Sequence, residues 1–273
     1  MKYGIISVVL LAICWTGFSS AEELPLVDTH IHYSHDAWEM LPPEKAVGLL
    51  RKAGLKYAFV SSSSDDGTQM LYDAAPNLVI PVLRPYRKRG ELSSWLYDES
   101  VPQMLERRLE KYKYAGIGEF HVFGDDTNLP VMRKVIQLAH DYGIFLHAHS
   151  DSKAVENIFK IQPQARVLWA HSGFEQPTEI RRMLSTYENL MADLAFRNEH
   201  AVNGEIDPQW QALFMEFPDR ITVGTDTYTP ERWFYVEDHA NWSREWLMTL
   251  PDQVRENIAY RNAERLKDWG LSK

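Results

Sequence analysis

The sequence predicts an α/β protein of the (β/α)₈, or TIM-barrel, class, and three observations support this. Short apolar, β-rich runs alternate with amphipathic stretches along the whole chain. No long Pro-, Gly- or Ser-rich linker, low-complexity block or internal repeat interrupts this alternation. Residues 22–273 have about the length of one barrel. We therefore expect a single domain over residues 22–273, with an open doubly wound sheet as the alternative.

The strands of this barrel are expected where apolar runs are bounded by turn-forming residues. Amphipathic patterns such as residues 43–53 and 129–142 predict the helices that lie between them. Alternating strands and helices favour a parallel sheet, and eight strands are enough to close it. The expected strands are residues 24–32, 56–62, 78–85, 114–122, 144–150, 166–172, 190–197 and 220–228.

Residues 1–21 are typical of a signal peptide. Lys2 precedes an apolar run over residues 5–15, and small residues then lead to Ala21. This pattern predicts cleavage after Ala21 and export, either to the periplasm or out of the cell. The apolar run is shorter than the roughly 20 residues that a spanning helix needs, so we expect no stable membrane span. A membrane anchor and lipidation of Cys14 remain the alternatives.

Composition excludes several classes of function. Cys14 is the only cysteine and lies in the segment to be removed, so the mature chain has no thiol nucleophile and no thiolate metal ligand. Acidic residues number 38 against 29 basic ones, giving a formal net charge of −9. Nucleic acid is therefore not an expected partner, although a local basic patch is compatible with this balance. A small-molecule substrate is favoured.

Histidines and a carboxylate stand near the predicted C-terminal ends of the strands, where a barrel has its catalytic rim. His30 and His32 are one residue apart, so the period of two in a strand turns both to the same side. His147 and His171 end apolar runs, and Asp226 ends the last strand. Buried groups of this kind need charge compensation, which a divalent cation supplies. The alternative is a set of separate, hydrogen-bonded barrel residues.

Several short motifs together resemble the amidohydrolase superfamily. They are Asp-Thr-His-Ile-His at residues 28–32, His147 at a strand end, Trp-Ala-His-Ser-Gly at residues 169–173 and Gly-Thr-Asp at residues 224–226. Residues 257–266 also resemble the C-terminal helix of amidohydrolase-related proteins. The resemblance covers essentially all of residues 22–273, and the order of the motifs is specific although each one is short.

The resemblance implies one or two divalent metal ions per chain, with zinc expected first and manganese or iron as alternatives. It implies that Asp226 is both a ligand and the general base, and that His171 belongs to the catalytic group. A metal such as zinc lowers the pKa of its bound water, so the resulting hydroxide can attack an electrophilic carbon or phosphorus. The implied ligands are His30, His32, His147, His171 and Asp226.

Glu119 occupies the position where members of this superfamily carry a bridging lysine carbamate, a bridging glutamate or no ligand. It is similar to the glutamate of TatD-type metal-dependent hydrolases. That similarity implies a binuclear site with Glu119 between the two ions. A role for Glu119 in binding substrate or in supporting the ligands is the alternative.

Two further histidines follow the same spacing. His147 and His149 are one residue apart, so both are expected to face inward while only one is a ligand. The resemblance favours His147 as the ligand, because it directly follows an apolar run, and His149 is then a substrate contact. His149 as the ligand is the alternative. His121 stands in the same relation to Glu119, as a substrate contact or an ordinary loop histidine.

Arg84 and Arg197 also lie near predicted strand ends, where a guanidinium can hold a carboxylate or phosphate by two parallel hydrogen bonds. They are candidate substrate contacts and favour an anionic substrate. Salt bridges at the rim are the alternative.

The resemblance therefore implies a metal-dependent hydrolase that acts on a small ester, lactone, amide or phosphoester through a metal-bound hydroxide. Three alternatives remain: a TatD-like phosphodiesterase or nuclease, a metal-dependent decarboxylase on the same barrel, and an exported metal-binding protein without turnover. The acidic charge balance argues against the nuclease, because phosphate contacts need Lys or Arg.

Overall fold

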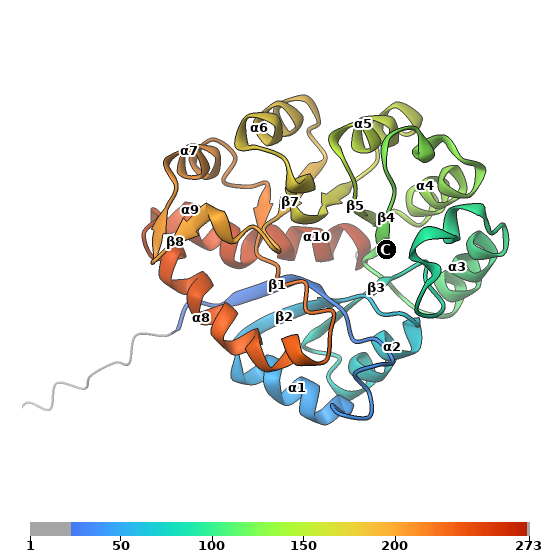
Figure 1. Ribbon diagram of the computed structural model, residues 1–273, viewed down its shortest axis with the longest axis horizontal. Coiled ribbons are helices and arrows are strands. Elements are labelled where there is room, and N and C mark those ends of the chain that lie inside the picture. Colours follow the sequence, from blue (N-terminus) through green and yellow to red (C-terminus); the bar gives the residue numbers. More distant parts are fainter. Residues whose placement is uncertain (1–22, 272–273) are drawn as a thin grey trace, which may run out of the picture.

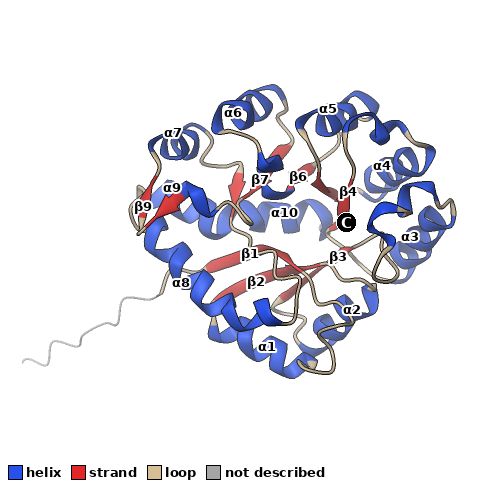
Figure 2. Cartoon of the chain, viewed as in Figure 1, coloured by secondary structure: helices blue, strands red, loops and turns tan. Residues whose placement is uncertain are grey.

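A computed structural model describes residues 23–271 of the 273-residue chain, so the predicted signal peptide and Cys14 lie outside the described residues. Eight parallel strands form one sheet in the order of the chain, and helices surround it (Figures 1 and 2). This confirms the predicted barrel class. The strands are β1 (Leu26–Ile31), β2 (Leu55–Val60), β3 (Val79–Leu83), β4 (Gly116–His121), β5 (Phe145–His149), β6 (Val167–Trp169), β7 (Leu190–Asp193) and β10 (Ile221–Thr222).

The barrel closes between its first and last strands, which excludes the open doubly wound sheet. The Thr29 backbone N–H donates to the Val223 carbonyl at 3.0 Å, and the His32 N–H donates to the Thr227 carbonyl at 2.9 Å. An isolated parallel bridge joins Ile31 to Thr227. These bonds place the end of β1 beside residues 223–227, although almost the whole chain separates them.

Amphipathic helices cover the outside of the strands, and their apolar faces are buried against the sheet. Several begin at a proline, which suits the first helical position because its missing N–H has no helical partner there. No helix among residues 23–271 is long and apolar enough to cross a membrane. The helices are α1 (Pro43–Lys52), α2 (Asp65–Ala74), α3 (Ser100–Lys111), α4 (Pro130–Tyr142), α5 (Ser152–Ile161), α6 (Pro177–Thr186), α7 (Pro208–Glu216), α8 (Val236–Leu247), α9 (Asp252–Glu256) and α10 (Asn262–Leu271).

The inside of the barrel is filled by its own small core, separate from the layer between strands and helices. Large apolar side chains from the strands meet there, among them Phe59 and Phe145, whose ring centroids are 6.1 Å apart. Ala263 and Leu266 of α10 belong to the same cluster, and Figure 1 shows α10 lying across the ring of strands. This helix therefore closes the end of the barrel opposite the strand C-termini.

The structure differs from the predicted strands mainly at their ends. The sixth strand stops at Trp169, and residues 171–173 turn in the left-handed region with φ between 49° and 65°. The last strand is only two residues long, and Asp226 has a φ of 47°. A short antiparallel hairpin of β8 (Ala201–Val202) and β9 (Glu205–Ile206) was not predicted. Non-glycine residues at positive φ are costly, and four of them, His171, Phe174, Phe196 and Asp226, lie at the predicted site.

Candidate metal centre

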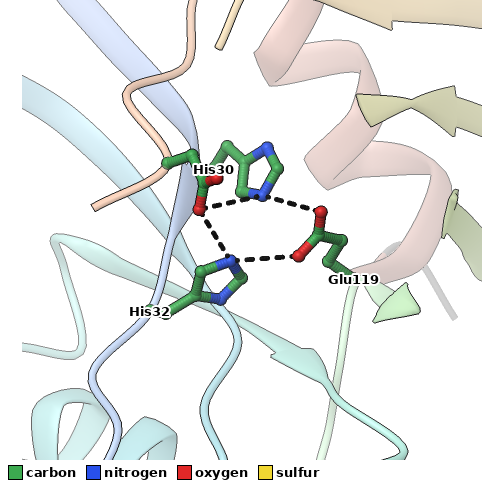
Figure 3. A group of neighbouring side chains, drawn as sticks. His30, His32 and Glu119 are labelled. Atoms are coloured by element: carbon green, nitrogen blue, oxygen red, sulfur yellow. Dashed lines mark ion pairs between the residues drawn. The ribbon is translucent and has the colours of Figure 1, made fainter. Parts of the chain in front are cut away.

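Four predicted site residues converge at the C-terminal end of the barrel. His30 and His32 come from the end of β1, Glu119 from β4 and Asp226 from the loop after β10. His30 Nε2 lies 3.5 Å from Glu119 Oε1 and 3.6 Å from Asp226 Oδ1. His32 Nε2 lies 3.3 Å from Glu119 Oε2 and 3.2 Å from Asp226 Oδ1. Figure 3 shows both imidazoles facing the Glu119 carboxylate.

Contacts of the two Nδ1 atoms fix the orientation of both imidazole rings. His32 Nδ1 donates to the Ser61 carbonyl at 2.6 Å, and His30 Nδ1 lies 3.1 Å from Asp193 Oδ2. Each Nε2 atom is buried and has no hydrogen-bond partner among the described residues. Fixing one ring nitrogen in this way leaves the other free to bind a metal.

The electrostatics of the group favour a cation. Burial by itself lowers the pKa of a histidine, but the carboxylates of Asp226, Glu119 and Asp193 raise the pKa of His30 well above its ordinary value. Burial acts in the opposite direction on Asp226, yet the charge of His30 and the contact with His32 lower its pKa to about 2. The carboxylates are therefore held ionised, and they attract positive charge to this point.

Asp193, at the end of β7, is a site residue that the sequence reasoning missed. Its Oδ2 lies 3.1 Å from His30 Nδ1 and 3.0 Å from His147 Nε2. Its Oδ1 accepts the backbone N–H groups of His171, at 2.8 Å, and Ala195, at 3.0 Å. The available signal was a lone carboxylate inside the apolar run at residues 190–195.

The two β5 histidines occupy different depths. His147 contacts Asp193, and burial lowers the pKa of His147 to about 4. His149 lies nearer the rim, where its Nδ1 is 2.8 Å from Glu119 Oε1. Both side chains face inward, as the spacing predicted. His149 contacts Glu119, whereas His147 contacts Asp193 behind His30, so each of the two histidines belongs to a group of side chains that could hold a metal ion.

His171 approaches the same carboxylates from the left-handed turn after β6. Its Nε2 lies 3.4 Å from Glu119 Oε1 and 3.8 Å from Asp226 Oδ2. Its Nδ1 donates to the Ala195 carbonyl at 3.0 Å, which fixes the ring with Nε2 toward the site. The tertiary structure thus brings His171 to the position that the sequence predicted for it.

Arg84 and His121 line the mouth of the site. Arg84 donates from Nη2 to Glu119 Oε2 at 2.8 Å and from Nε to the Glu119 carbonyl at 3.1 Å. His121 stacks on His149 with ring centroids 4.1 Å apart, and its Nδ1 lies 2.9 Å from the Tyr86 hydroxyl. Burial lowers the pKa of His121 to about 3, so this ring is neutral.

Arg197 has a different position from the one expected of a substrate contact. It is only 3% exposed, and its guanidinium donates to the His171 carbonyl at 2.9 Å and to the Glu175 carbonyl at 2.7 Å. It also pairs with Glu199 at 2.6 Å. Because its donors are used within the protein, Arg197 holds the turn that carries His171 and does not line the pocket above the metal centre.

That pocket has a volume of about 340 Å³ and opens directly onto the carboxylates. A pocket of this size suits a small molecule. Charged groups, imidazoles and aromatic rings all contribute to its lining. It is lined by Arg84, Glu119, His121, His149, His171, Phe174, Phe196, Asp226 and Tyr228.

Solved structures share this fold at low sequence identity. An uncharacterised TIM-barrel protein from Bordetella bronchiseptica is 15% identical over 90% of this chain and 99% of its own, with a TM-score of 0.62. A putative 2-pyrone-4,6-dicarboxylic acid hydrolase from Pseudomonas putida is 12% identical over 91% of this chain and 99% of its own, with a TM-score of 0.59. A probable hydrolase of the same description from Acinetobacter baumannii is 11% identical over 89% and 98% of the two chains, with a TM-score of 0.59.

No curated protein matches the chain in sequence. The family profile described as amidohydrolase matches residues 82–267, from the end of β3 to α10. The match covers more than half of the chain and includes Glu119, the two β5 histidines, His171 and Asp226. The chain therefore belongs to the amidohydrolase family, which makes it a metal-dependent hydrolase, and the buried group of His30, His32, Glu119 and Asp226 could hold a divalent metal.

Proposed function

We propose that this protein binds a divalent metal at the centre described above and hydrolyses a small ester, lactone, amide or phosphoester there. One observation carries the proposal: the buried Nε2 atoms of His30 and His32 lack hydrogen-bond partners among the described residues and face the carboxylates of Glu119 and Asp226. The potential ligand atoms of these four residues all lie within 4.8 Å of one another. Imidazole and carboxylate donors suit zinc, manganese or iron.

We further propose that Glu119 bridges two ions. Its Oε1 faces His30, His149 and His171, whereas its Oε2 faces His32. A carboxylate with separate histidines on each oxygen suits a two-metal site. In this proposal His149, which contacts Glu119, is the β5 ligand, and His147 supports His30 through Asp193.

The chain's own residues divide the chemistry between them. A bound divalent cation supplies a water of lowered pKa and polarises the group under attack. Asp226 is ionised at neutral pH and lies at the pocket floor, so its carboxylate accepts the proton of the attacking water and returns it to the leaving group. Phe174, Phe196 and Tyr228 line the pocket and offer apolar contact to the organic part of the substrate.

The volume of the pocket and the names of similar solved structures both support a small substrate. A pocket of about 340 Å³ is large enough for a compact small molecule. Two of the similar folds are named as hydrolases of 2-pyrone-4,6-dicarboxylic acid, which is consistent with a small, oxygen-rich substrate.

The metal stoichiometry tests the bridging role of Glu119. We expect two ions per chain in the purified protein, measured by elemental mass spectrometry, and about one in Glu119→Ala, because the shared ligand is gone. A single ion that is unaffected by this substitution would contradict the bridge and favour a mononuclear lactonase or decarboxylase.

Turnover tests the role of Asp226. Asp226→Asn keeps the size of the side chain but cannot accept a proton, so kcat should fall by a factor of about 100 or more on ester and lactone panels. Asp141→Asn, an exposed position on α4, is the matched control and should leave kcat unchanged. Circular dichroism checks that both variants are folded, and retained activity in folded Asp226→Asn would refute the base assignment.

A further inference from the structure

We propose that a second pocket beside the metal centre binds an anionic group of the substrate, either a carboxylate or a phosphate. This pocket has a volume of about 140 Å³ and lies at the same rim of the barrel. Arg84 and Tyr228 line both pockets, so the two adjoin. The inference deepens the proposed function, because it names the class of substrate that the same site takes.

Positive charge dominates the lining of this second pocket. Three cations, Arg84, Lys88 and Arg89, line it against a single carboxylate, Asp36. Arg89 lies 3.2 Å from Asp36, so these two largely offset each other. Lys88 forms no ion pair with any residue between 23 and 271. An ammonium group without a partner at the edge of a cavity is an attractive position for an anion.

Arg84 connects this pocket to the reacting groups. Its Nε and Nη2 atoms donate hydrogen bonds to Glu119, whereas Nη1 has no hydrogen-bond acceptor among the described residues. The Tyr86 ring supports the guanidinium, with its centroid 4.9 Å from Arg84 Cζ. A substrate whose reacting bond lies over Asp226 could therefore place an anionic group in the adjoining pocket, between Arg84 and Lys88.

The loop that carries Lys88 and Arg89 is held in place by their neighbour Arg87. Its guanidinium donates to Glu91 Oε1 at 2.8 Å, to Asp98 Oδ2 at 2.5 Å and to Ser100 Oγ at 2.7 Å. Its backbone N–H also donates to Glu91 Oε2 at 2.7 Å. Arg87 is thus committed to the protein while Lys88 and Arg89 stay exposed. A fixed loop lowers the entropy cost of binding a ligand.

The cluster of basic residues at this pocket contrasts with the acidic charge of the whole molecule. With a formal net charge of −9, the protein repels anions at long range. Four of the six residues from 84 to 89 are nevertheless basic, and three of these four line the pocket. The acidic composition was compatible with a local basic patch. This patch lies beside the predicted catalytic centre.

Calorimetric titration of the zinc-loaded full chain tests the proposal with matched ligands. Butyrate and succinate have the same number of carbons, but succinate carries a second carboxylate, and 3-phosphonopropionate replaces that group by a phosphonate. We expect Lys88→Met to weaken succinate or 3-phosphonopropionate about three- to tenfold and to leave butyrate unchanged. If Lys88→Met weakens succinate binding more, the pocket takes a carboxylate. If it weakens 3-phosphonopropionate binding more, the pocket takes a phosphate.

Two further variants separate a local site from general electrostatics or misfolding. Lys134→Met removes the same charge from an exposed position on α4 and should change no affinity. Asp36→Asn removes the competing carboxylate and should strengthen succinate binding about threefold. Opposite effects of Lys88→Met and Asp36→Asn cannot both arise from loss of structure.

The proposal fails if wild type binds succinate and 3-phosphonopropionate no more tightly than butyrate, or if Lys88→Met weakens all three ligands equally. Because calorimetry requires no turnover, absence of hydrolysis counts only against the proposed function. Metal content measured on the same samples shows whether the centre itself was loaded.

Discussion

At the scale of single residues, Asp193 organises the site without facing its pocket. One carboxylate oxygen contacts His30 and His147, and the other accepts two backbone N–H groups. Burial opposes ionisation, but the charge of His30 and the bond to His147 hold the pKa of Asp193 far below its usual range. A carboxylate behind a ligating histidine sets the ring's tautomer and increases its basicity.

Asp193→Asn should therefore weaken metal binding about 10- to 100-fold, because a neutral amide no longer stabilises positive charge at His30. Competition with a chelator of known affinity measures this change. Glu119→Ala, by contrast, should change the number of bound ions. Unchanged metal affinity in a folded Asp193→Asn protein would contradict a positioning role for this residue.

His200 makes stability depend on pH. Burial lowers its pKa from 6.5 to about 4, and its ring packs against Trp210, Trp242 and Trp246. The unfolded chain takes up this proton near pH 6.5, whereas the folded chain resists it. The stabilisation is therefore complete above pH 6.5 and is lost progressively toward pH 4, by about 3 kcal/mol in total.

In His200→Phe, the free energy of unfolding should decrease less between pH 6.5 and pH 4 than in wild type. At neutral pH the variant also loses the hydrogen bond between His200 Nδ1 and the Arg197 carbonyl. Urea denaturation at about pH 7 and about pH 4.5 measures the difference. An equal fall in wild type and variant would show that His200 does not contribute.

At the scale of elements, the helices α5 and α7 each begin at an aspartate whose side chain caps the helix. Asp151 caps α5 by accepting the Ala154 N–H at 2.8 Å, and the same oxygen accepts the Gly124 N–H at 2.9 Å. Asp207 caps α7 but accepts only N–H groups of its own helix, from Gln209 and Trp210. Asp151 therefore joins the loops after β4 and β5, which directly follow the site histidines His121 and His149.

Asp151→Ala should lower the free energy of unfolding by about 2 kcal/mol, since a cap and a loop contact are both lost. Asp207→Ala, which loses the cap alone, should cost about 1 kcal/mol. Urea denaturation of the two variants gives the comparison. Equal costs would mean that the contact with Gly124 adds no stability.

At the scale of the whole molecule, the barrel has a functional end and a stabilising end. The strand C-termini carry the site, and α10 closes the other end with Leu266 in the interior core. Asn262 ties this helix to the last strand by donating to the Ile221 carbonyl at 2.7 Å. Stability and chemistry are therefore supported by separate parts of the fold.

Leu266→Ala should reduce the free energy of unfolding by about 2–5 kcal/mol, because this side chain is fully buried and its loss leaves a cavity. Met248→Ala, at a residue that is 59% exposed, should cost less than about 0.5 kcal/mol. Metal content should stay the same in both folded variants, since neither residue lies near the site. A loss of metal in folded Leu266→Ala would contradict this separation.

Much of the barrel could be predicted from the sequence because its signals are local. Apolar runs and amphipathic periods extend over a few residues, and they indicated all eight strands in order. The period of two likewise predicted that His30 and His32 share a side, as do His147 and His149. Strand ends were less predictable, since the left-handed turns at residues 171–173 and at Asp226 are stabilised by distant groups.

Only the tertiary structure decided which of these inward-facing groups meet. The depth of His147 and His149 depends on the stagger between β5 and its neighbours, which no local pattern encodes. Asp193 and Arg197 show the same limit, because their partners lie on other strands and turns. The sequence by itself determined the barrel, its order and its metal-binding residue types, whereas long-range packing determined the geometry of the centre and the cationic pocket beside it.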